Sequence, residues 1–374
     1  MDTYLENFLP HLRCPISKTA LRPVLPEQLS KFNERIAQQD LFHTDGSAVP
    51  EPLHEALISE DEQYVYPIVD GRIAVLLESL GIVTNTQNAS VQRLDAEKKI
   101  VMDFYDEFGW KKNEDDLFED TAAFEDRRTI AADYWSRCHL RVNRYLPNGQ
   151  YILDVASGAI PNDEFFTYSD HFQVRICMDF SLLAMQQAVR RMNGQGVFIL
   201  GDMTNMPLVD ACLDAIVSLN TVYHIPRAEQ TQAVAESYRL LKPGGKAVII
   251  YSWKDAPLMY WTMRGWRALL RLVKRRKQIA SGSPAAPSRP ELFMHQQTYR
   301  WYARELRRPF HAQLRVYSAL TRSFSNTFIR EKTMGRQLSK LIYQLENLFP
   351  RFFGRYGQYP IFVVNKPGSG QKHP

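Results

Sequence analysis

Short apolar runs alternate with amphipathic stretches through the middle of the chain. The runs are apolar along their length, as strands buried on both faces of a sheet are. One intervening helix is clear, because it follows Pro226, places Val234, Tyr238 and Leu241 on one face, and ends at Lys242-Pro-Gly-Gly245. Strands separated by helices of this length predict parallel pairing with right-handed crossovers. The predicted strands are 151–155, 174–178, 197–200, 214–219 and 246–251.

Helical periodicity also precedes this region, over residues 96–146. Ile100, Phe104 and Phe108 recur at every fourth position, which predicts one helix face. A second helix is expected after Asp120-Thr121, ending at Pro147-Asn-Gly149. Its apolar face holds Ile130, Tyr134, Cys138, Val142 and Tyr145.

The pattern changes at both ends of the chain. Residues 1–80 are expected to form a small separate unit that contains a β-hairpin over 64–77, with Asp70-Gly71 in its turn. Residues 81–95 are polar and lack periodicity, which indicates a linker. Beyond Tyr251 the predicted elements are an aromatic and basic helix over 258–277, a strand over 312–318, a helix over 338–348 and a closing strand over 359–365. Residues 368–374 are expected to be a disordered tail.

Composition is that of a globular protein of 374 residues. No run approaches the roughly 18 apolar residues that a membrane-spanning helix needs. The first residues lack the basic-then-apolar pattern of a signal peptide. The four cysteines are scattered, which favours reduced thiols and a cytoplasmic location.

Charge is distributed unevenly along the chain. Residues 1–250 hold 23 Lys and Arg against 36 Asp and Glu, a balance of −13, whereas residues 251–374 hold 23 against 5, a balance of +18. A basic C-terminal third is suited to nucleic acid, an anionic membrane surface or an acidic substrate. A solvated face, or docking on the protein's own acidic half, explains the same charges, so charge alone leaves these alternatives open.

Candidate chemistry lies where three of the predicted strands end. Asp154, Asp179 and Asp202 each end or directly follow an apolar run. The carboxyl ends of parallel strands meet at one edge of a sheet, and open α/β folds bind ligands at that edge. The spacing of these carboxylates indicates a nucleoside cofactor.

The order of motifs resembles the class I S-adenosylmethionine-dependent methyltransferases, and most of all the group containing the quinone-biosynthesis enzymes. The likeness rests on Asp154…Gly158, Asp179, Gly201-Asp202-Met203, Leu213-Asp214 and Leu240-Leu-Lys-Pro-Gly-Gly245. It covers about residues 96–367, with a cap insertion at about 252–311. It implies an α/β, Rossmann-like, seven-stranded and mostly parallel sheet, with helices on both faces and an antiparallel last strand.

The N-terminal unit, expected to be a small α+β domain, resembles the zinc-ribbon-like activator domain found beside tRNA and protein methyltransferases. Cys14-Pro and Tyr66-Pro-Ile-Val-Asp-Gly carry this likeness. Ser17 stands where the second cysteine of the first pair is usual, and no Cys-x-x-Cys precedes Tyr66. Because tetrahedral zinc needs four ligands, we expect no metal here.

The resemblance also implies cofactor-binding residues. The family's first loop is acid-x-Gly-x-Gly-x-Gly, and Asp154, Ala156, Gly158 and Ile160 occupy those positions, so we expect a changed helix entry because Ile160 lacks glycine's conformational freedom. Asp179 is expected to accept the ribose hydroxyls and Asp202 the adenine amino group; N-capping and turn-capping are the structural alternatives. Asp214 is expected to be structural. The cofactor-binding set is Asp154, Ala156, Ser157, Gly158, Asp179, Phe180, Asp202, Met203 and Asn220.

Two residues are candidates for catalysis. His224 follows the fourth predicted strand of the sheet and is a candidate general base, with packing under the next helix as an equal alternative. Tyr105, with Trp110, is a candidate lid over the site, and core packing is the alternative. Methyl transfer needs few other catalytic side chains, because a sulfonium methyl group is already activated.

The sequence therefore predicts a methyltransferase that uses S-adenosyl-L-methionine on a small-molecule or lipid-like acceptor. The helix over 258–277 is suited to peripheral contact with the inner face of a membrane or to capping the protein's own core. Two other functions stay open, an RNA methyltransferase and a non-catalytic scaffold that binds the cofactor. Asn220-Thr-Val-Tyr223 lacks the proline pair of a familiar class of base methyltransferases, which disfavours nucleic acid.

Overall fold

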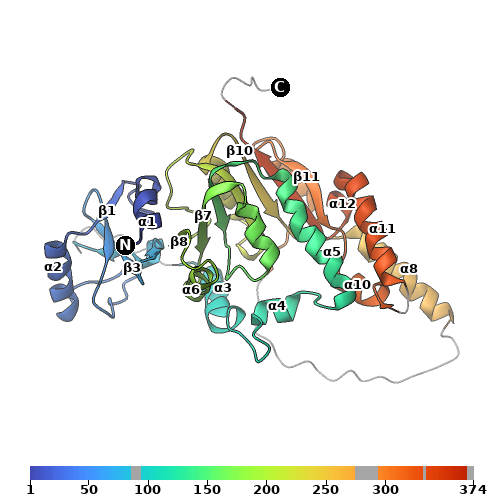
Figure 1. Ribbon diagram of the computed structural model, residues 1–374, viewed down its shortest axis with the longest axis horizontal. Helices are drawn as coiled ribbons and strands as arrows, with labels where there is room; N and C mark the ends of the chain where they lie inside the picture. Colours follow the sequence, from blue (N-terminus) through green and yellow to red (C-terminus); the bar gives the residue numbers. More distant parts are fainter. Residues whose placement is uncertain (86–93, 274–293, 332–333, 369–374) are drawn as a thin grey trace.

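The central sheet fixes the architecture (Figure 1). The computed structural model describes residues 1–85, 94–273, 294–331 and 334–368. Seven strands of the sheet follow the order β8-β7-β6-β9-β10-β12-β11. β12 runs antiparallel to β10 and β11, and the other neighbouring pairs among these seven strands are parallel, which confirms the predicted Rossmann-like α/β fold. The strands are β6 (Gly149–Val155), β7 (Phe172–Asp179), β8 (Val197–Leu200), β9 (Leu213–Leu219), β10 (Leu241–Ile250), β11 (Gln313–Ser318) and β12 (Tyr359–Asn365).

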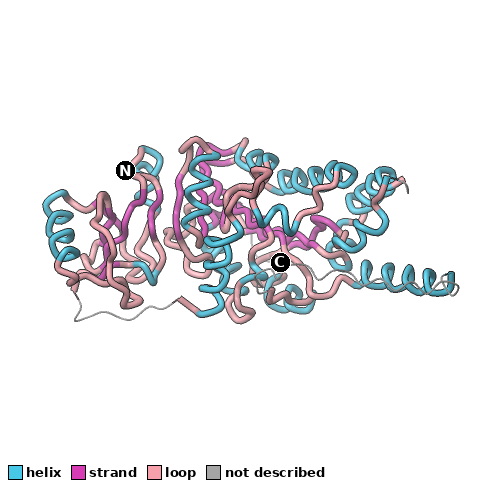
Figure 2. Tube along the Cα trace, turned by 90° about the horizontal axis from the view of Figure 1, so that it is seen from below, coloured by secondary structure: helices cyan, strands magenta, loops and turns pink. Residues whose placement is uncertain are grey.

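Helices cover both faces of this sheet (Figure 2). Successive residues of a strand point to opposite faces, so Ile152 and Leu153 of β6 lie in different apolar clusters. Leu153 packs with α7 (Gln230–Leu240) and the π-helix η8 (Tyr302–Leu306). Ile152 packs with α5 (Thr129–Leu140) and α6 (Leu182–Arg191). The sheet is thus buried on both sides, as its continuous apolar strands predict.

The N-terminal unit continues this sheet through its hairpin. β3 (Tyr64–Val69) and β4 (Ile73–Val75) are antiparallel, as predicted, and β4 pairs in parallel with β8. Ile82–Val83 forms β5 and pairs with β3, which corrects the prediction that the linker begins at residue 81. Residues 86–93 of that linker lie outside the described residues. The other elements of the unit are α1 (Thr3–Phe8), η1 (Leu9–His11), β1 (Leu21–Pro23), α2 (Pro26–Ala37), β2 (Ala56–Ser59) and η2 (Glu78–Leu80).

The first helix after the linker buries a partly different face from the predicted one. α3 (Ala96–Phe104) buries Lys98, Val101 and Phe104, whereas Ile100 is 43% exposed. The prediction for Ile100 is therefore wrong, whereas Phe104 is buried as predicted, and Lys98 is buried because it pairs with Asp202. A π-helix, η4 (Tyr105–Gly109), extends α3. α4 (Glu119–Phe124), η5 (Arg141–Tyr145), η6 (Asp163–Ser169) and η7 (Val222–His224) complete this part.

The C-terminal third adds helices at the β11 end of the sheet (Figure 1). The helix predicted over 258–277 is α8 (Pro257–Val273); residues 274–293 lie outside the described residues, as do 369–374 of the predicted tail. No helix among the described residues has the length and apolar character to cross a bilayer. The other helices here are α9 (Tyr299–Trp301), α10 (Arg322–Phe328), α11 (Gly335–Leu348) and α12 (Pro350–Tyr356).

Candidate functional site

Three adjacent strand tips form the candidate site. β6, β7 and β8 are parallel neighbours, so Asp154, Asp179 and Asp202 lie along one edge of the sheet. Asp179 is buried, and its carboxylate joins two loops. Its Oδ2 accepts a hydrogen bond from the Gly158 N–H (2.8 Å) and its Oδ1 from the Ser181 N–H (3.0 Å). Burial raises the pKa of Asp179 to about 6, despite these bonds.

The loop after β6 keeps a conformation typical of glycine at all three motif positions. Ala156, Gly158 and Ile160 have φ of 54°, 55° and 54°. This corrects the expectation that Ile160 cannot adopt the left-handed conformation. The segment that follows is the 3₁₀-helix η6, so no α-helix follows the loop directly.

Burial explains how Ile160 occupies that conformation. A non-glycine residue in the left-handed region costs roughly 1–3 kcal/mol. The Ile160 side chain is 0% exposed and packs in the cluster with Ile152. Full burial of an isoleucine contributes about 1.5–3 kcal/mol, which offsets the backbone strain.

Asp154 forms a buried ion pair with Arg175 of β7. Arg175 also donates to the Phe165 carbonyl (2.7 Å), which fixes the guanidinium. The second carboxylate oxygen of Asp154, Oδ1, has no hydrogen-bond partner among the described residues. Asn220 Oδ1 and Trp110 Nε1 share this property and also come from segments at the tips. Buried polar atoms usually have partners, so these three atoms suit a polar ligand.

A segment that begins in α3 lies across all three tips. Lys98 Nζ donates to Asp202 Oδ2 (2.8 Å), at the tip after β8. The Asp106 carboxylate accepts from the Ser181 hydroxyl, at the tip after β7. The Trp110 ring covers Gly158, at the tip after β6, so closely that a Cβ on Gly158 would lie 2.2 Å from Trp110 Cζ2. We call Lys98–Trp110 the lid segment.

Asp202 is engaged on both carboxylate oxygens. Oδ1 accepts from the Thr204 N–H (2.7 Å), the turn-capping alternative expected from the sequence, and Oδ2 accepts from Lys98. Lys98 also donates to Thr204 Oγ1 (2.8 Å) and pairs with Glu229. Movement of the lid segment away from the tips would therefore free Oδ2 of Asp202 for a ligand.

The remaining residues predicted for the cofactor lie around these tips. Ser157 is buried, and its N–H donates to the Met178 carbonyl (3.2 Å), tying the loop to β7. Met203 is buried in the apolar cluster that contains Leu153, and Phe180 packs partly buried against the cluster that contains Ile152. Asp214 accepts from the N–H groups of Gln150 and Tyr151 (both 2.9 Å) at the start of β6, away from the tips, in keeping with a structural role.

The two candidate catalytic residues lie in different environments. His224 is buried in η7, with its ring 4.5 Å from that of Tyr223. Tyr105 stacks on Trp110 at 5.4 Å in the lid segment. Burial raises the pKa of Tyr105 far above its usual range, so its hydroxyl stays protonated and can donate a hydrogen bond but cannot serve as a base.

Sequence reasoning missed two charged groups here. Lys98 has no signal in the sequence, because a lysine in a helix is ordinarily exposed. Burial raises the pKa of both Tyr105 and Tyr223, and the nearby carboxyl group of Asp120 in α4 raises each further. Burial raises the pKa of Asp120 itself to about 7. A carboxyl group with such a pKa is suited to proton transfer near neutral pH.

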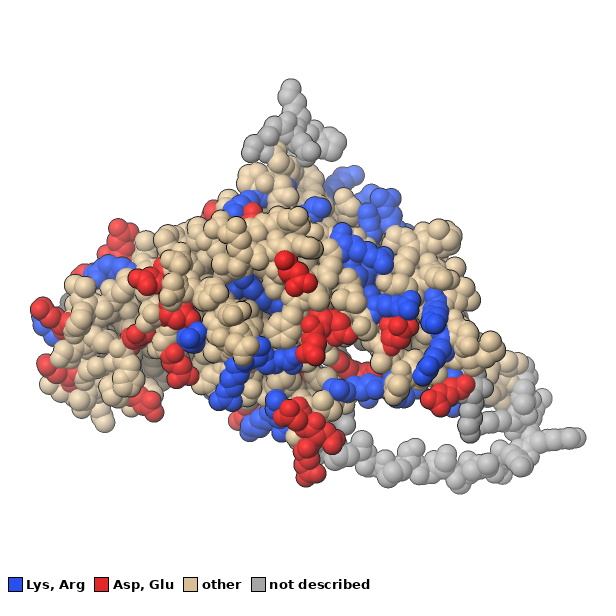
Figure 3. Space-filling view, viewed as in Figure 1, with Lys and Arg blue, Asp and Glu red and all other residues tan. Residues whose placement is uncertain are grey.

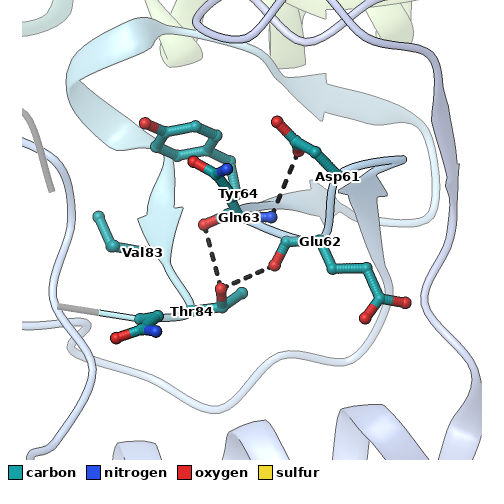
Figure 4. A pocket seen from close by; sticks show the side chains of 7 residues that line it. Asp61, Glu62, Gln63, Tyr64, Val83 and Thr84 are labelled. Carbon is teal, nitrogen blue, oxygen red and sulfur yellow. Dashed lines mark hydrogen bonds between the residues drawn. The ribbon is translucent and has the colours of Figure 1, made fainter. Parts of the chain in front are cut away.

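A separate cavity of about 250 Å³ lies in the N-terminal unit, beside β3 and β5 (Figure 4). Thr84 Oγ1 donates to the Glu62 carbonyl (2.7 Å), and the Gln63 N–H donates to Asp61 Oδ1 (3.3 Å). None of the strand-tip residues lines it, so it does not belong to the candidate site.

Comparison with known proteins identifies the region that carries the site. Residues 153–249 match the family model described as a methyltransferase domain. The chain is similar to a demethylmenaquinone methyltransferase of Renibacterium salmoninarum, with 36% identity over 101 residues, which are 27% of this chain and 40% of that protein. It is also similar to a sterol 24-C-methyltransferase of Schizosaccharomyces pombe, with 24% identity over 184 residues, 43% of this chain and 44% of that protein.

The matches to these two relatives thus span less than half of each relative's length. Among solved structures, the chain is similar to a geranyl diphosphate C-methyltransferase of Streptomyces coelicolor, determined with geranyl diphosphate and S-adenosylhomocysteine. That likeness has a TM-score of 0.42 and 12% identity, and it covers 73% of this chain and 100% of the other.

Proposed function

The chain contains an S-adenosylmethionine-dependent methyltransferase domain, and from this premise we propose that the whole protein methylates a small-molecule or lipid-like acceptor. The observation that carries the proposal is the convergence of three strand tips under one lid segment. S-adenosylmethionine, when bound, supplies an activated methyl group. The protein's own residues then need to bind the cofactor, orient the acceptor and exclude water.

The residues at the tips fit the cofactor's three parts. Asp179 is held by two backbone N–H groups in an orientation that leaves lone pairs for the ribose hydroxyls. The methionine part of the cofactor is assigned to the backbone of Ala156, Ser157 and Gly158. The oxygen of Asp154 that has no partner among the described residues suits the ammonium group of that methionine part.

The other cofactor residues lie farther along the edge. Asp202 and the Met203 N–H are assigned to adenine, with Phe180 against its ring. Asn220 is half-buried, its Oδ1 has no hydrogen-bond partner among the described residues, and it is assigned to the amino-acid end.

The lid segment contributes by exclusion and positioning. Its three contacts, through Lys98, Asp106 and Trp110, close the edge from solvent and must open for cofactor to enter. Once closed, such a site fixes the acceptor atom in line with the reacting bond, and positioning of this kind contributes on the order of 7–11 kcal/mol to lowering a barrier.

A base is needed only if the acceptor carries a proton that must leave. His224 and Asp120 are the two candidates, and Asp120 is favoured by its pKa of about 7. Tyr105 is assigned a positioning role, because its hydroxyl stays protonated.

A lipid-like acceptor is supported by the elements around the sheet. α8 exposes Tyr260 (57%), Trp261 (63%) and Leu269 (50%), and its only charged side chains over 257–271 are arginines. We assign it to peripheral contact with the inner face of a membrane, from a cytoplasmic location. The relatives named above act, by their names, on demethylmenaquinone and sterol. The N-terminal unit is assigned an accessory role without metal, since Cys14 Sγ lies 3.2 Å from Tyr66 Oη inside its core.

One experiment tests the function and its acceptor class. The protein is incubated with S-adenosylmethionine labelled in its methyl group and with one of three extracts, namely total lipid, aqueous metabolites or total RNA. We expect label in lipid or in small metabolites, and much less label with the Asp179→Asn variant at the same cofactor concentration. Label in RNA contradicts the acceptor assignment. Failure of wild type to bind S-adenosylhomocysteine by calorimetry contradicts the function itself.

A further inference from the structure

Helix α11 presents an unusual distribution of side chains. It buries a carboxylate, because Glu346 is 0% exposed, accepts from the Tyr134 hydroxyl (2.7 Å) and pairs with Arg141 (2.9 Å). It exposes three leucines, Leu341 (51%), Leu345 (37%) and Leu348 (68%). Their spacing of four and three residues places them on one helix face.

The exposed apolar face continues into α12. Phe349 is 51% and Phe352 48% exposed, directly after the last leucine of α11. We call Leu341, Leu345, Leu348, Phe349 and Phe352 the apolar ridge. Scattered apolar residues on a surface need no explanation, whereas five in a continuous run along two helices indicate an interaction surface.

The charges around the ridge have one sign. Over residues 335–356, Glu346 is the one acidic residue, and it is buried, whereas Arg336, Lys340, Arg351 and Arg355 are exposed. Figure 3 shows Lys and Arg gathered at this end of the molecule. An apolar surface framed by cations matches the order of groups in an anionic lipid interface, with acyl chains beneath phosphates.

A groove beside the ridge concentrates these cations. It has a volume of about 490 Å³, lies between α12 and the β11 region, and is lined by Arg307, Arg315, Arg351 and Arg355 with no carboxylate. None of the four arginines forms an ion pair with a residue in the described ranges. Phe352 lines the groove and belongs to the ridge, so the two features are continuous. Guanidinium groups bind phosphate in a fork geometry.

We propose that the arginine groove and the apolar ridge dock this protein on a membrane of anionic phospholipid. The arginines bind the lipid phosphates, and the ridge enters the interface. α8 lies at the same end of the molecule (Figures 1 and 2) and contacts α12, so its exposed aromatic residues extend the docking end. The proposal rests on the proposed function in one respect, because a lipid-like acceptor would be reached from that surface.

Flotation of the full chain with vesicles tests this docking, without cofactor or acceptor. One set of vesicles is phosphatidylcholine alone, and the other contains phosphatidylglycerol in equal part. We expect binding to the anionic vesicles only, weakened by salt. Arg351→Gln with Arg355→Gln is expected to weaken binding by about 30-fold, and Leu345→Gln with Leu348→Gln by about tenfold. The control, Leu25→Gln with Lys31→Gln, removes an exposed apolar group and a charge from the N-terminal unit and is expected to bind as wild type.

Three results would overturn the proposal. The first is equal affinity for both kinds of vesicle, and the second is equal binding by all variants. The third is a change of molecular mass in sedimentation that the ridge substitutions abolish, because the ridge would then join protein copies. S-adenosylhomocysteine binding, measured on the same samples, is expected to be unchanged in every variant. Failure of the wild-type chain to dock on anionic vesicles while it still binds S-adenosylhomocysteine would therefore refute this surface and leave the proposed function standing.

Discussion

Asp179→Asn separates the structural role of this carboxylate from its proposed role in binding. In the wild type, one carboxylate accepts from Gly158 and Ser181 and still has lone pairs for two ribose hydroxyls. The asparagine side chain has the same shape, but one oxygen becomes an NH₂ group. That group faces a backbone N–H and cannot accept from it, nor from a hydroxyl.

The expected magnitudes follow from these contacts. One backbone donor left without its acceptor costs about 1–3 kcal/mol of the free energy of unfolding. Loss of a hydrogen bond between a ribose hydroxyl and a charged acceptor costs about 1.5–3 kcal/mol of binding, which weakens S-adenosylhomocysteine affinity by roughly 10- to 150-fold.

The pH dependence gives an independent readout. The carboxyl of the free protein takes up a proton as the pH falls through about 6. Bound ribose favours the ionised form, so wild-type affinity should fall as the pH falls below that value, by up to about tenfold per unit. The asparagine variant has no such group and should show a flat profile over the same range.

Asp214→Asn is the matched control. Asp214 also accepts two backbone N–H bonds within the same sheet, at the opposite end of β6. Calorimetric titration with S-adenosylhomocysteine and thermal unfolding are measured on both variants. We expect both to lose stability and only Asp179→Asn to lose affinity. Equal affinity in Asp179→Asn and wild type, or a wild-type affinity independent of pH, would refute the ribose assignment.

Three further predictions concern the lid, the base and the strained loop. Lys98→Met removes the ammonium group that competes with adenine for Asp202, so S-adenosylhomocysteine should bind more tightly. The free energy of unfolding should fall by about 3–5 kcal/mol, because the buried carboxylate loses its partner. Unchanged or weaker binding in calorimetry would show that adenine does not bind at Asp202. Asp120→Asn should lose most of the activity, and its kcat/KM should no longer rise as the pH rises through about 7. His224→Gln should keep that rise. The reverse pattern would identify His224 as the base. Ile160→Gly relieves roughly 1–3 kcal/mol of backbone strain but loses about 2–5 kcal/mol of packing. Chemical denaturation should therefore show a lower free energy of unfolding, and a more stable variant would show that the strain exceeds the packing.

The order of strands and helices followed from the sequence because apolar runs and their lengths are local properties. The strands at 151–155, 174–178 and 359–365 appear in the structure within one or two residues at each end. The edge where Asp154, Asp179 and Asp202 gather followed as well, because parallel strands end at one edge whatever their side chains are.

Side-chain partners across that edge did not follow from the sequence. The sequence predicted a changed helix entry from Ile160, and a 3₁₀-helix does follow the loop. It did not predict that Ile160 itself would adopt the left-handed conformation, which the burial of its side chain in the cluster with Ile152 stabilises. It gave no sign that Lys98 would reach Asp202, more than a hundred residues away along the chain.

What the sequence by itself determined was therefore the α/β order, the carboxylates at the strand ends and the excess of basic residues in the C-terminal third. Only the tertiary structure decided which groups meet: the lid segment over the tips, the raised pKa of Asp120, and the leucines of α11 that face outward while Glu346 lies inside. The physical reason is that periodicity records which face of an element is apolar, whereas burial, pKa and ion pairing depend on what packs against that face from elsewhere in the chain.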